Sequence, residues 1–117
     1  QCRYNAMERL GIISELIGTI KGTLYDCGSY PGAVLGNPKT KKRIIGDLIQ
    51  VRNVAEAMSQ LDYIEGFYGF GDPHSLFCRR IVPVELSNGK TALAWVYGYN
   101  KSVSNLNQIK SGDWVKR

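Results

Sequence analysis

The sequence predicts a single α+β domain whose sheet is curled or closed into a small mixed β-barrel, with one main helix and one short helix. Two observations indicate this class. The expected strands are joined mainly by hairpins and loops instead of regular helical crossovers. One segment, after residue 53, has helical periodicity over several turns. The 117 residues, 44% hydrophobic and 21% charged, suit one folded domain over residues 1–117.

The first half of the chain predicts a short helix followed by strands. Residues 4–10 suit the short helix. Residues 12–25 are rich in Ile, Leu and Thr and contain two glycines, which predicts either one long bent strand or two short strands. Turn residues at 26–32 and a polar turn at 37–42 then lead to a strand at 43–51.

The main helix carries a carboxylate on its inward side. Asn53 and Glu56 have the spacing of a capping box. Steps of four, three and four residues then form an apolar stripe from Val54, Met58, Leu61 and Glu65. Burial and the negative end of the helix dipole both raise the pKa of Glu65, as a general acid or base near neutral pH requires. The alternative is a side chain that turns outward and pairs with Arg79 or Arg80.

The second half of the chain predicts a lid and a hairpin. Residues 66–75 are rich in glycine and aromatic residues, a composition that suits a loop over a site. Strands are expected at 77–86 and 91–99, joined by a turn at Asn88 and Gly89. The segment 111–114 is expected to be a loop with an anchoring tryptophan.

Composition argues against several classes of protein. Three widely spaced cysteines without a Cys-x-x-Cys pair predict reduced thiols in the cytoplasm, with neither a disulfide framework nor a zinc site. His74, the single histidine, suits a loop and argues against a metal site or a histidine-based triad. No apolar run is long enough for a membrane helix. The basic run at 39–43 is either a solvated loop or an attractor of anionic ligands, and the absence of interleaved aromatics argues against nucleic acid.

Six short motifs follow one another along nearly the whole chain. They are GTLYDCGSYP at residues 22–31, IGDLIQV at 45–51, LDYIEG at 61–66, FCR at 77–79, AWVY at 94–97 and SGDW at 111–114. In this order they resemble the motifs of the gamma-glutamylcyclotransferase-like family, which includes the AIG2-like and gamma-glutamylamine cyclotransferase branch. The chain has Asp47 where the family usually has Glu, and Phe77 where it has Tyr.

The resemblance implies an enzyme, of the transferase or lyase type, with a small mixed barrel and a cavity for a gamma-glutamyl group. Glu65 would take a proton from the α-amine of the substrate, which attacks the γ-carbonyl carbon of the same molecule. Glu65 would then protonate the departing amine and leave 5-oxoproline. Proximity lowers the barrier of this ring closure, so no metal or organic cofactor is expected. The implied substrate-binding residues are Tyr30, Pro31, Gly66, Phe77 and Arg79.

The chain departs from the family pattern at its start. The family opens with a strand carrying Y-G-T-L or Y-G-S-L, and no such motif precedes Asn5. We expect the chain to begin just after that strand. This departure and Phe77 motivate an alternative, a non-catalytic small-molecule-binding protein on the same fold. A third hypothesis, a basic adaptor for nucleic acid or an acidic partner, rests only on the net charge of +5.

Two of the candidate site residues also have purely structural interpretations. The Tyr30–Pro31 pair suits a rigid turn as well as a pocket wall. Arg79 suits a surface cation on a strand, or a structural partner of a carboxylate, as well as a substrate-binding group.

Overall fold

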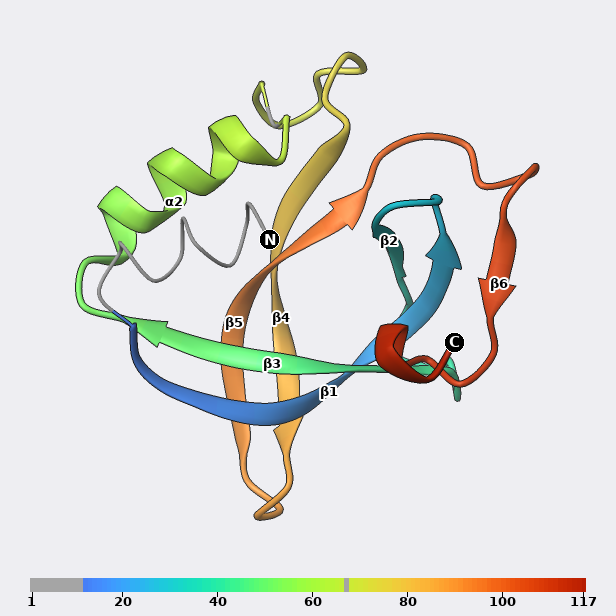
Figure 1. The fold of residues 1–117 in the computed structure, drawn as a ribbon. Helices are drawn as coiled ribbons and strands as arrows, with labels where there is room; N and C mark the ends of the chain where they lie inside the picture. The colour runs from blue at the N-terminus through green and yellow to red at the C-terminus, as the bar shows by residue number, and fades with distance from the viewer. Residues whose placement is uncertain (1–11, 67) are drawn as a thin grey trace.

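The computed structural model describes residues 12–66 and 68–117 and has an α+β architecture (Figure 1). Six strands form a strongly curled, antiparallel sheet, and one α-helix lies at one end of it. The elements are β1 (Ile12–Asp26), β2 (Pro31–Leu35), β3 (Arg43–Val51), α2 (Val54–Ile64), β4 (Phe77–Leu86), β5 (Thr91–Tyr99), β6 (Asn107–Ile109) and the 3-10 helix η1 (Trp114–Lys116). The α+β prediction is confirmed. Within the described residues the sheet stays open, and the short helix expected at 4–10 lies outside them.

Strand β1 pairs with every other strand except β5, which pairs with β4. Of the two sequence alternatives, a single long strand is the observed one. Its first half pairs with β3 and its second half with β2 and β6. It also meets β4 at Gly18, where an added Cβ would lie 2.4 Å from Cγ1 of Val84. The glycine at this position therefore allows the two strands to cross closely.

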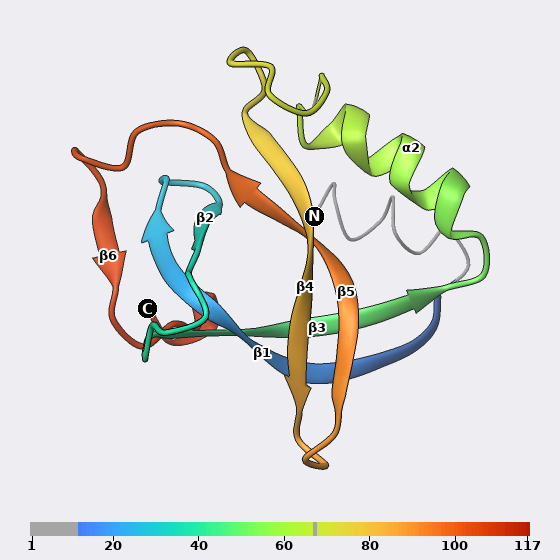
Figure 2. The same ribbon diagram turned by 180° about the vertical axis from the view of Figure 1, so that it is seen from behind.

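Strands β4 and β5 form the hairpin that the sequence predicts, and Figure 2 shows it crossing the sheet from the helix end to the far side. The register pairs Phe77 with Tyr99 and Arg79 with Tyr97. Because side chains alternate between the faces of a strand, these four residues lie on one face of the hairpin. Val84 is buried on the opposite face.

The hydrophobic core lies at the end of the molecule away from α2. It consists of Leu24, Ile44 and Ile109, with Ile20, Ala33 and Trp114 packed against it. The predicted anchoring role of Trp114 is therefore observed. The segment before it is attached to β3, because the Ile45 N–H donates to the Gly112 carbonyl oxygen at 2.8 Å. Among the described residues, no helix is long and apolar enough to cross a membrane.

The turn at Gly112 gives a direct test of this attachment. Gly112 has φ +69°, and an added Cβ would lie 2.1 Å from the Arg43 carbonyl oxygen. We expect Gly112→Ala to lower the free energy of unfolding by about 2 kcal/mol or more, because backbone strain and a steric clash act together. Urea denaturation measures the change.

Gly28→Ala is the matched control. Gly28 has φ +102°, but nothing lies within 4 Å of an added Cβ, so this variant adds only backbone strain, about 1 kcal/mol. Equal losses of stability in the two variants would contradict the close packing of the 109–113 turn against β3.

Candidate functional site

Helix α2 places Glu65 at its carboxyl end, with the side chain buried. The helix begins at Asn53, whose side-chain oxygen accepts the Glu56 N–H at 3.0 Å, as the capping spacing predicted. It ends at Glu65, whose own N–H donates to the Leu61 carbonyl at 2.8 Å. Glu65 is only 8% exposed. The side chain of Glu65 therefore points inward, as predicted. The alternative, in which this side chain turns outward, is not observed.

The apolar stripe of α2 differs from the prediction at its start. Val54 is 52% exposed, whereas Ala57, one turn later, is buried and Met58 and Leu61 are half-buried. The prediction that Val54 faces inward is wrong. Residues 54–56, the first turn of the helix, are all exposed, so periodicity alone does not determine burial there.

The carboxylate of Asp62 joins α2 to the β4–β5 hairpin. One oxygen of Asp62 lies 3.1 Å from Nε of Arg79, and the Tyr97 hydroxyl donates to the same oxygen. Arg79 and Tyr97 face each other across the hairpin. The structural interpretation of Arg79, as the partner of a carboxylate, is thus observed, with Asp62 as that carboxylate.

Aromatic rings surround the Arg79 guanidinium. Its Cζ lies 4.4 Å from the centre of the Trp95 ring and 5.6 Å from that of Phe70. Trp95, in the AWVY motif, is partly exposed and lies against Arg79. Both cation–π contacts hold the guanidinium in place. Phe70 belongs to the predicted lid, so this loop reaches the Asp62–Arg79 pair.

Tyr97 connects this pair to Glu65. Burial raises the pKa of Tyr97 most, followed by the hydrogen bond to Asp62 and the charge of Asp62, and the Glu65 charge adds a smaller increase. The Arg79 charge acts in the opposite direction. Tyr97 therefore remains a protonated donor at neutral pH, and Glu65 is close enough to influence it electrostatically.

Tyr30 and Phe77 form an aromatic wall next to Arg79. Phe77 is 3% exposed, and its ring centre lies 6.0 Å from that of Tyr30 and 5.6 Å from that of Tyr99. The Tyr99 side chain forms a hydrogen bond with Cys27, and burial raises the pKa of this thiol. Pro31 is the first residue of β2 and pairs with Asp26, which fits the rigid-turn interpretation.

The loop between α2 and β4 is closed at its base. Gly66, with φ +66°, follows the helix, and its carbonyl oxygen accepts the Leu76 N–H at 2.9 Å. Inside the loop the buried Ser75 hydroxyl accepts the Tyr68 N–H at 2.8 Å. The loop is therefore a folded unit attached beside Glu65.

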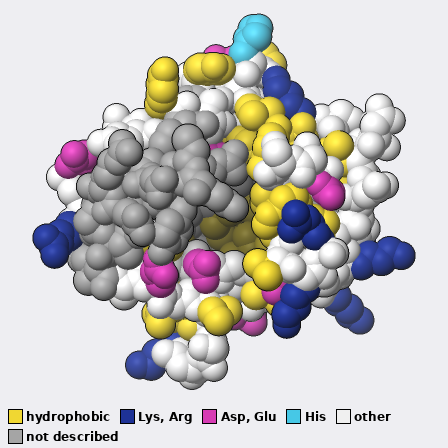
Figure 3. Space-filling view, viewed as in Figure 1, with side chains coloured by type: hydrophobic (Ala, Val, Ile, Leu, Met, Phe, Trp, Pro, Cys, Tyr) yellow, Lys and Arg dark blue, Asp and Glu magenta, His cyan; other side chains and the backbone are white. Residues whose placement is uncertain are grey.

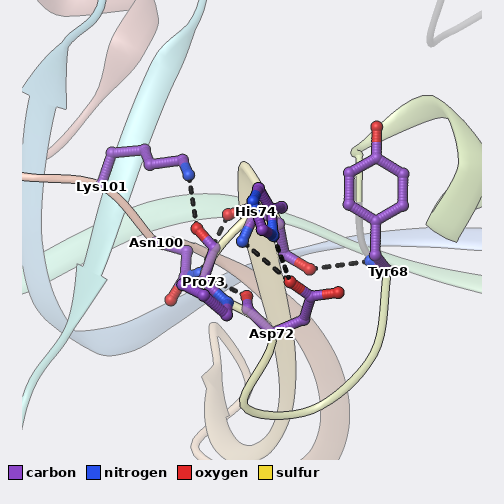
Figure 4. Close-up of polar contacts among 7 residues, drawn as sticks. Tyr68, Asp72, Pro73, His74, Asn100 and Lys101 are labelled. Carbon is purple, nitrogen blue, oxygen red and sulfur yellow. Dashed lines mark hydrogen bonds and ion pairs between the residues drawn. The ribbon is translucent and has the colours of Figure 1, made fainter.

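Residues after β5 hold this loop from the other side (Figure 4). The Asn100 amide donates to the Ser75 carbonyl at 2.9 Å, and the Lys101 ammonium donates to the Pro73 carbonyl at 2.6 Å. Asp72 accepts the His74 N–H at 2.9 Å, and its carboxylate lies 3.2 Å from the exposed imidazole. His74 is thus a loop residue, as predicted.

Contacts described above involve several of the predicted site residues. Arg79 meets Asp62 of α2, the helix that ends at Glu65 and Gly66, and the Tyr30 ring lies near that of Phe77. Sequence reasoning did not select Asp62 and Tyr97, although both lie within two of the quoted motifs, LDYIEG and AWVY. Figure 3 shows a recess with hydrophobic side chains at its floor on the face of the molecule seen in Figure 1. Among the described residues, no group of three His, Cys, Asp or Glu could hold a metal ion.

Comparison with known proteins identifies the class. Residues 3–116 match the family described as "Gamma-glutamyl cyclotransferase, AIG2-like", and the chain belongs to this family.

Two curated relatives are similar in sequence. The chain is 33% identical over 97 residues to the gamma-L-glutamyl-butirosin B gamma-glutamyl cyclotransferase of Niallia circulans. The matched region covers 82% of this chain and 56% of that protein. It is 30% identical over 94 residues to the gamma-glutamylcyclotransferase family protein YtfP of Escherichia coli, covering 80% of this chain and 68% of YtfP. The chain thus spans little more than half the length of the first relative.

Two solved structures have the same fold. The solution structure of E. coli YtfP matches with a TM-score of 0.57 at 29% identity, over 92% of this chain and 77% of YtfP. An uncharacterized protein from Pyrococcus horikoshii matches with a TM-score of 0.55 at 20% identity, over 95% of this chain and 76% of that one. The second match supports the fold alone.

The raised pKa of Tyr97 predicts a pH-dependent loss of stability. The unfolded chain releases this proton near the usual pKa of 10.0, whereas the folded protein retains it, so stability falls as pH rises above about 10. We expect Tyr97→Phe to reduce this slope and also to cost about 1.5–3 kcal/mol at pH 7, because a hydrogen bond to a charged group is lost.

Urea denaturation at several pH values between 7 and 11 measures both effects. Tyr63→Phe is the control, since Tyr63 is 89% exposed. Because the pKa of Tyr99 is also raised, the slope in Tyr97→Phe is reduced and not abolished. Identical pH profiles for Tyr97→Phe and the wild type would exclude the burial of this hydroxyl.

Proposed function

We propose that this protein is a gamma-glutamyl cyclotransferase that converts a gamma-glutamyl amine, or a related gamma-glutamyl compound, to 5-oxoproline and a free amine. The observation that carries the proposal is the buried carboxylate of Glu65 at the end of α2, the helix that Asp62 joins to Arg79 and Tyr97 of the hairpin. Membership of the family supports the reaction type. The proposal treats residues 1–117 as one domain of this type. The free thiols of Cys27 and Cys78 favour a cytoplasmic location for the protein.

Glu65 is the proposed general acid and base. It accepts a proton from the α-amino nitrogen of the substrate as that nitrogen attacks the γ-carbonyl carbon. A carbon–nitrogen bond forms within the substrate and closes a five-membered ring. The bond from the γ-carbon to the leaving amine then breaks, and Glu65 returns the proton to that amine. No water is consumed. The rate acceleration comes from the proximity of the two reacting groups and from positioned proton transfer.

The surroundings of Glu65 suit this role in a specific way. A carboxylate that must exchange a proton at each step benefits from little exposure to water and from a fixed direction. The Asp62–Arg79 pair and the Tyr97 hydroxyl fix the end of α2 and supply that direction. We assign them as positioning residues and keep the catalytic role for Glu65.

The remaining predicted site residues are assigned to substrate binding. The Tyr30 and Phe77 rings provide an apolar wall for the methylene groups of the glutamyl chain. Pro31 holds the Tyr30 turn, and Gly66 lets the chain leave the helix directly after Glu65. Arg79, predicted from the sequence as a substrate-binding residue, is paired with Asp62 and belongs to the positioning residues above.

Removal of the carboxylate charge tests the proposal. The full-length protein is incubated with a panel of gamma-glutamyl amines and gamma-glutamyl dipeptides, and 5-oxoproline is quantified by mass spectrometry. We expect Glu65→Gln to lower kcat/KM by about 10²- to 10⁴-fold, the usual contribution of a general acid or base.

Glu85→Gln, a change of the same type at an exposed position of β4, is the matched control and should retain activity. Thermal unfolding of both variants checks that they are folded. Absence of 5-oxoproline from the wild-type protein with every substrate, or unchanged turnover in Glu65→Gln, would reject the proposal.

A binding protein without chemistry remains the second candidate function. Phe77 favours it, because its buried ring carries no hydroxyl at a position where related proteins are expected to have tyrosine. In that case the gamma-glutamyl compounds raise the melting temperature in a saturable way and remain intact.

A further inference from the structure

A second concave surface lies away from Glu65, beside β6 and the C-terminus. It consists of two adjoining hollows of about 550 Å³ and about 250 Å³, which share residues 108–111. The charged side chains that line them are almost all basic. They are Lys41, Lys42, Arg43, Lys110, Lys116 and Arg117, with Asp26 as the single acid. We call this surface the basic groove.

The fold brings three separate basic segments together in the basic groove. The segments are residues 41–43, residue 110 and residues 116–117. The turn between the second and third segments is attached to β3 by the Ile45 N–H to Gly112 carbonyl bond and is closed by the Gly112 N–H to the Ile109 carbonyl at 3.0 Å. The first segment is held against β1, because the Gly22 N–H donates to the Lys42 carbonyl at 3.2 Å. Backbone hydrogen bonds therefore fix the positions from which these cations project.

Acidic neighbours do not neutralise this cluster. Across residues 12–66 and 68–117 the recorded ion pairs are Asp62 with Arg79 and Asp72 with His74, and neither includes a residue of the basic groove. Asp26 already accepts the Gly28 N–H at 2.8 Å. Figure 3 shows Lys and Arg side chains projecting from the side of the molecule that carries the C-terminus in Figure 1. Like charges in a concave surface focus a positive potential that attracts anions.

We propose that the basic groove binds a small molecule carrying several phosphate groups. Lysine ammonium groups and arginine guanidinium groups are the side chains that recognise phosphate, and six of them line this one open depression.

The lining also distinguishes this ligand from single-stranded nucleic acid. Bases bind by stacking on exposed aromatic rings, and the groove's lining contains no aromatic residue among the described part of the chain. The nearby Trp114 ring is covered by the Arg117 guanidinium, whose Cζ lies 3.5 Å from the ring centre. The proposal does not depend on the cyclotransferase activity, since no residue placed at that site lines the groove.

Isothermal titration of the full-length protein with inorganic tripolyphosphate tests the proposal. We expect saturable binding at one site that weakens as salt concentration rises. The double variant Lys42→Glu, Lys110→Glu should weaken binding by about tenfold or more, since two attractive contacts become repulsive.

The matched control is Arg52→Glu, Lys90→Glu, which makes the same change in net charge at exposed positions outside the groove. We expect less than a twofold effect from it, and thermal unfolding confirms that both double variants are folded. Equal weakening by the two double variants, absence of saturable binding, or tighter binding of a single-stranded oligonucleotide than of tripolyphosphate would each overturn the proposal.

Discussion

The arrangement of the candidate site depends on the carboxylate of Asp62. One of its oxygens meets both Nε of Arg79 and the hydroxyl of Tyr97, which come from neighbouring strands. Arg79 and Tyr97 are paired on one face of the hairpin. The Asp62 carboxylate that meets both therefore fixes the rotation of α2 about its own axis and its distance from the sheet. Glu65 lies three residues further along the same helix, so its position follows from that contact. Loss of the carboxylate would leave a partly buried guanidinium without this partner, which is costly.

The fold keeps two kinds of surface apart. The end that holds α2 combines carboxylates with aromatic rings around a single arginine. The opposite end combines a small apolar core with the cations of the basic groove. Strand β1 connects them, since it pairs with β3 towards one end and with β2 and β6 towards the other. A long curled strand thus allows a small domain to present two chemically different regions at its two ends.

Local features of the structure agree closely with the sequence. The Asn53 cap, the hairpin turn before Lys90 and the anchoring of Trp114 depend on hydrogen bonds and contacts over a few residues, which residue type and spacing specify. The burial of Glu65 could also be predicted, because the helical period places it on the inner side of its last turns. The helical period wrongly places Val54 on the buried side. How much of a helix is covered depends on the neighbouring elements and not on the helix sequence alone.

The sequence by itself determined the order of the four long strands and the main helix, the helix cap and the buried direction of Glu65, because these depend on local backbone preferences and periodicity. The short strands β2 and β6 were not predicted, since they form only by pairing with β1. Only the tertiary structure decided which carboxylate Arg79 meets, since Asp62 and Arg79 are brought together by the register of β4 with β5 and by the path of the loop between them. The same holds for the basic groove, whose first segment, residues 41–43, lies more than sixty residues before the other two and meets them through the backbone bonds around Gly112. Contacts over such separations depend on the whole set of strand pairings, which no short pattern contains.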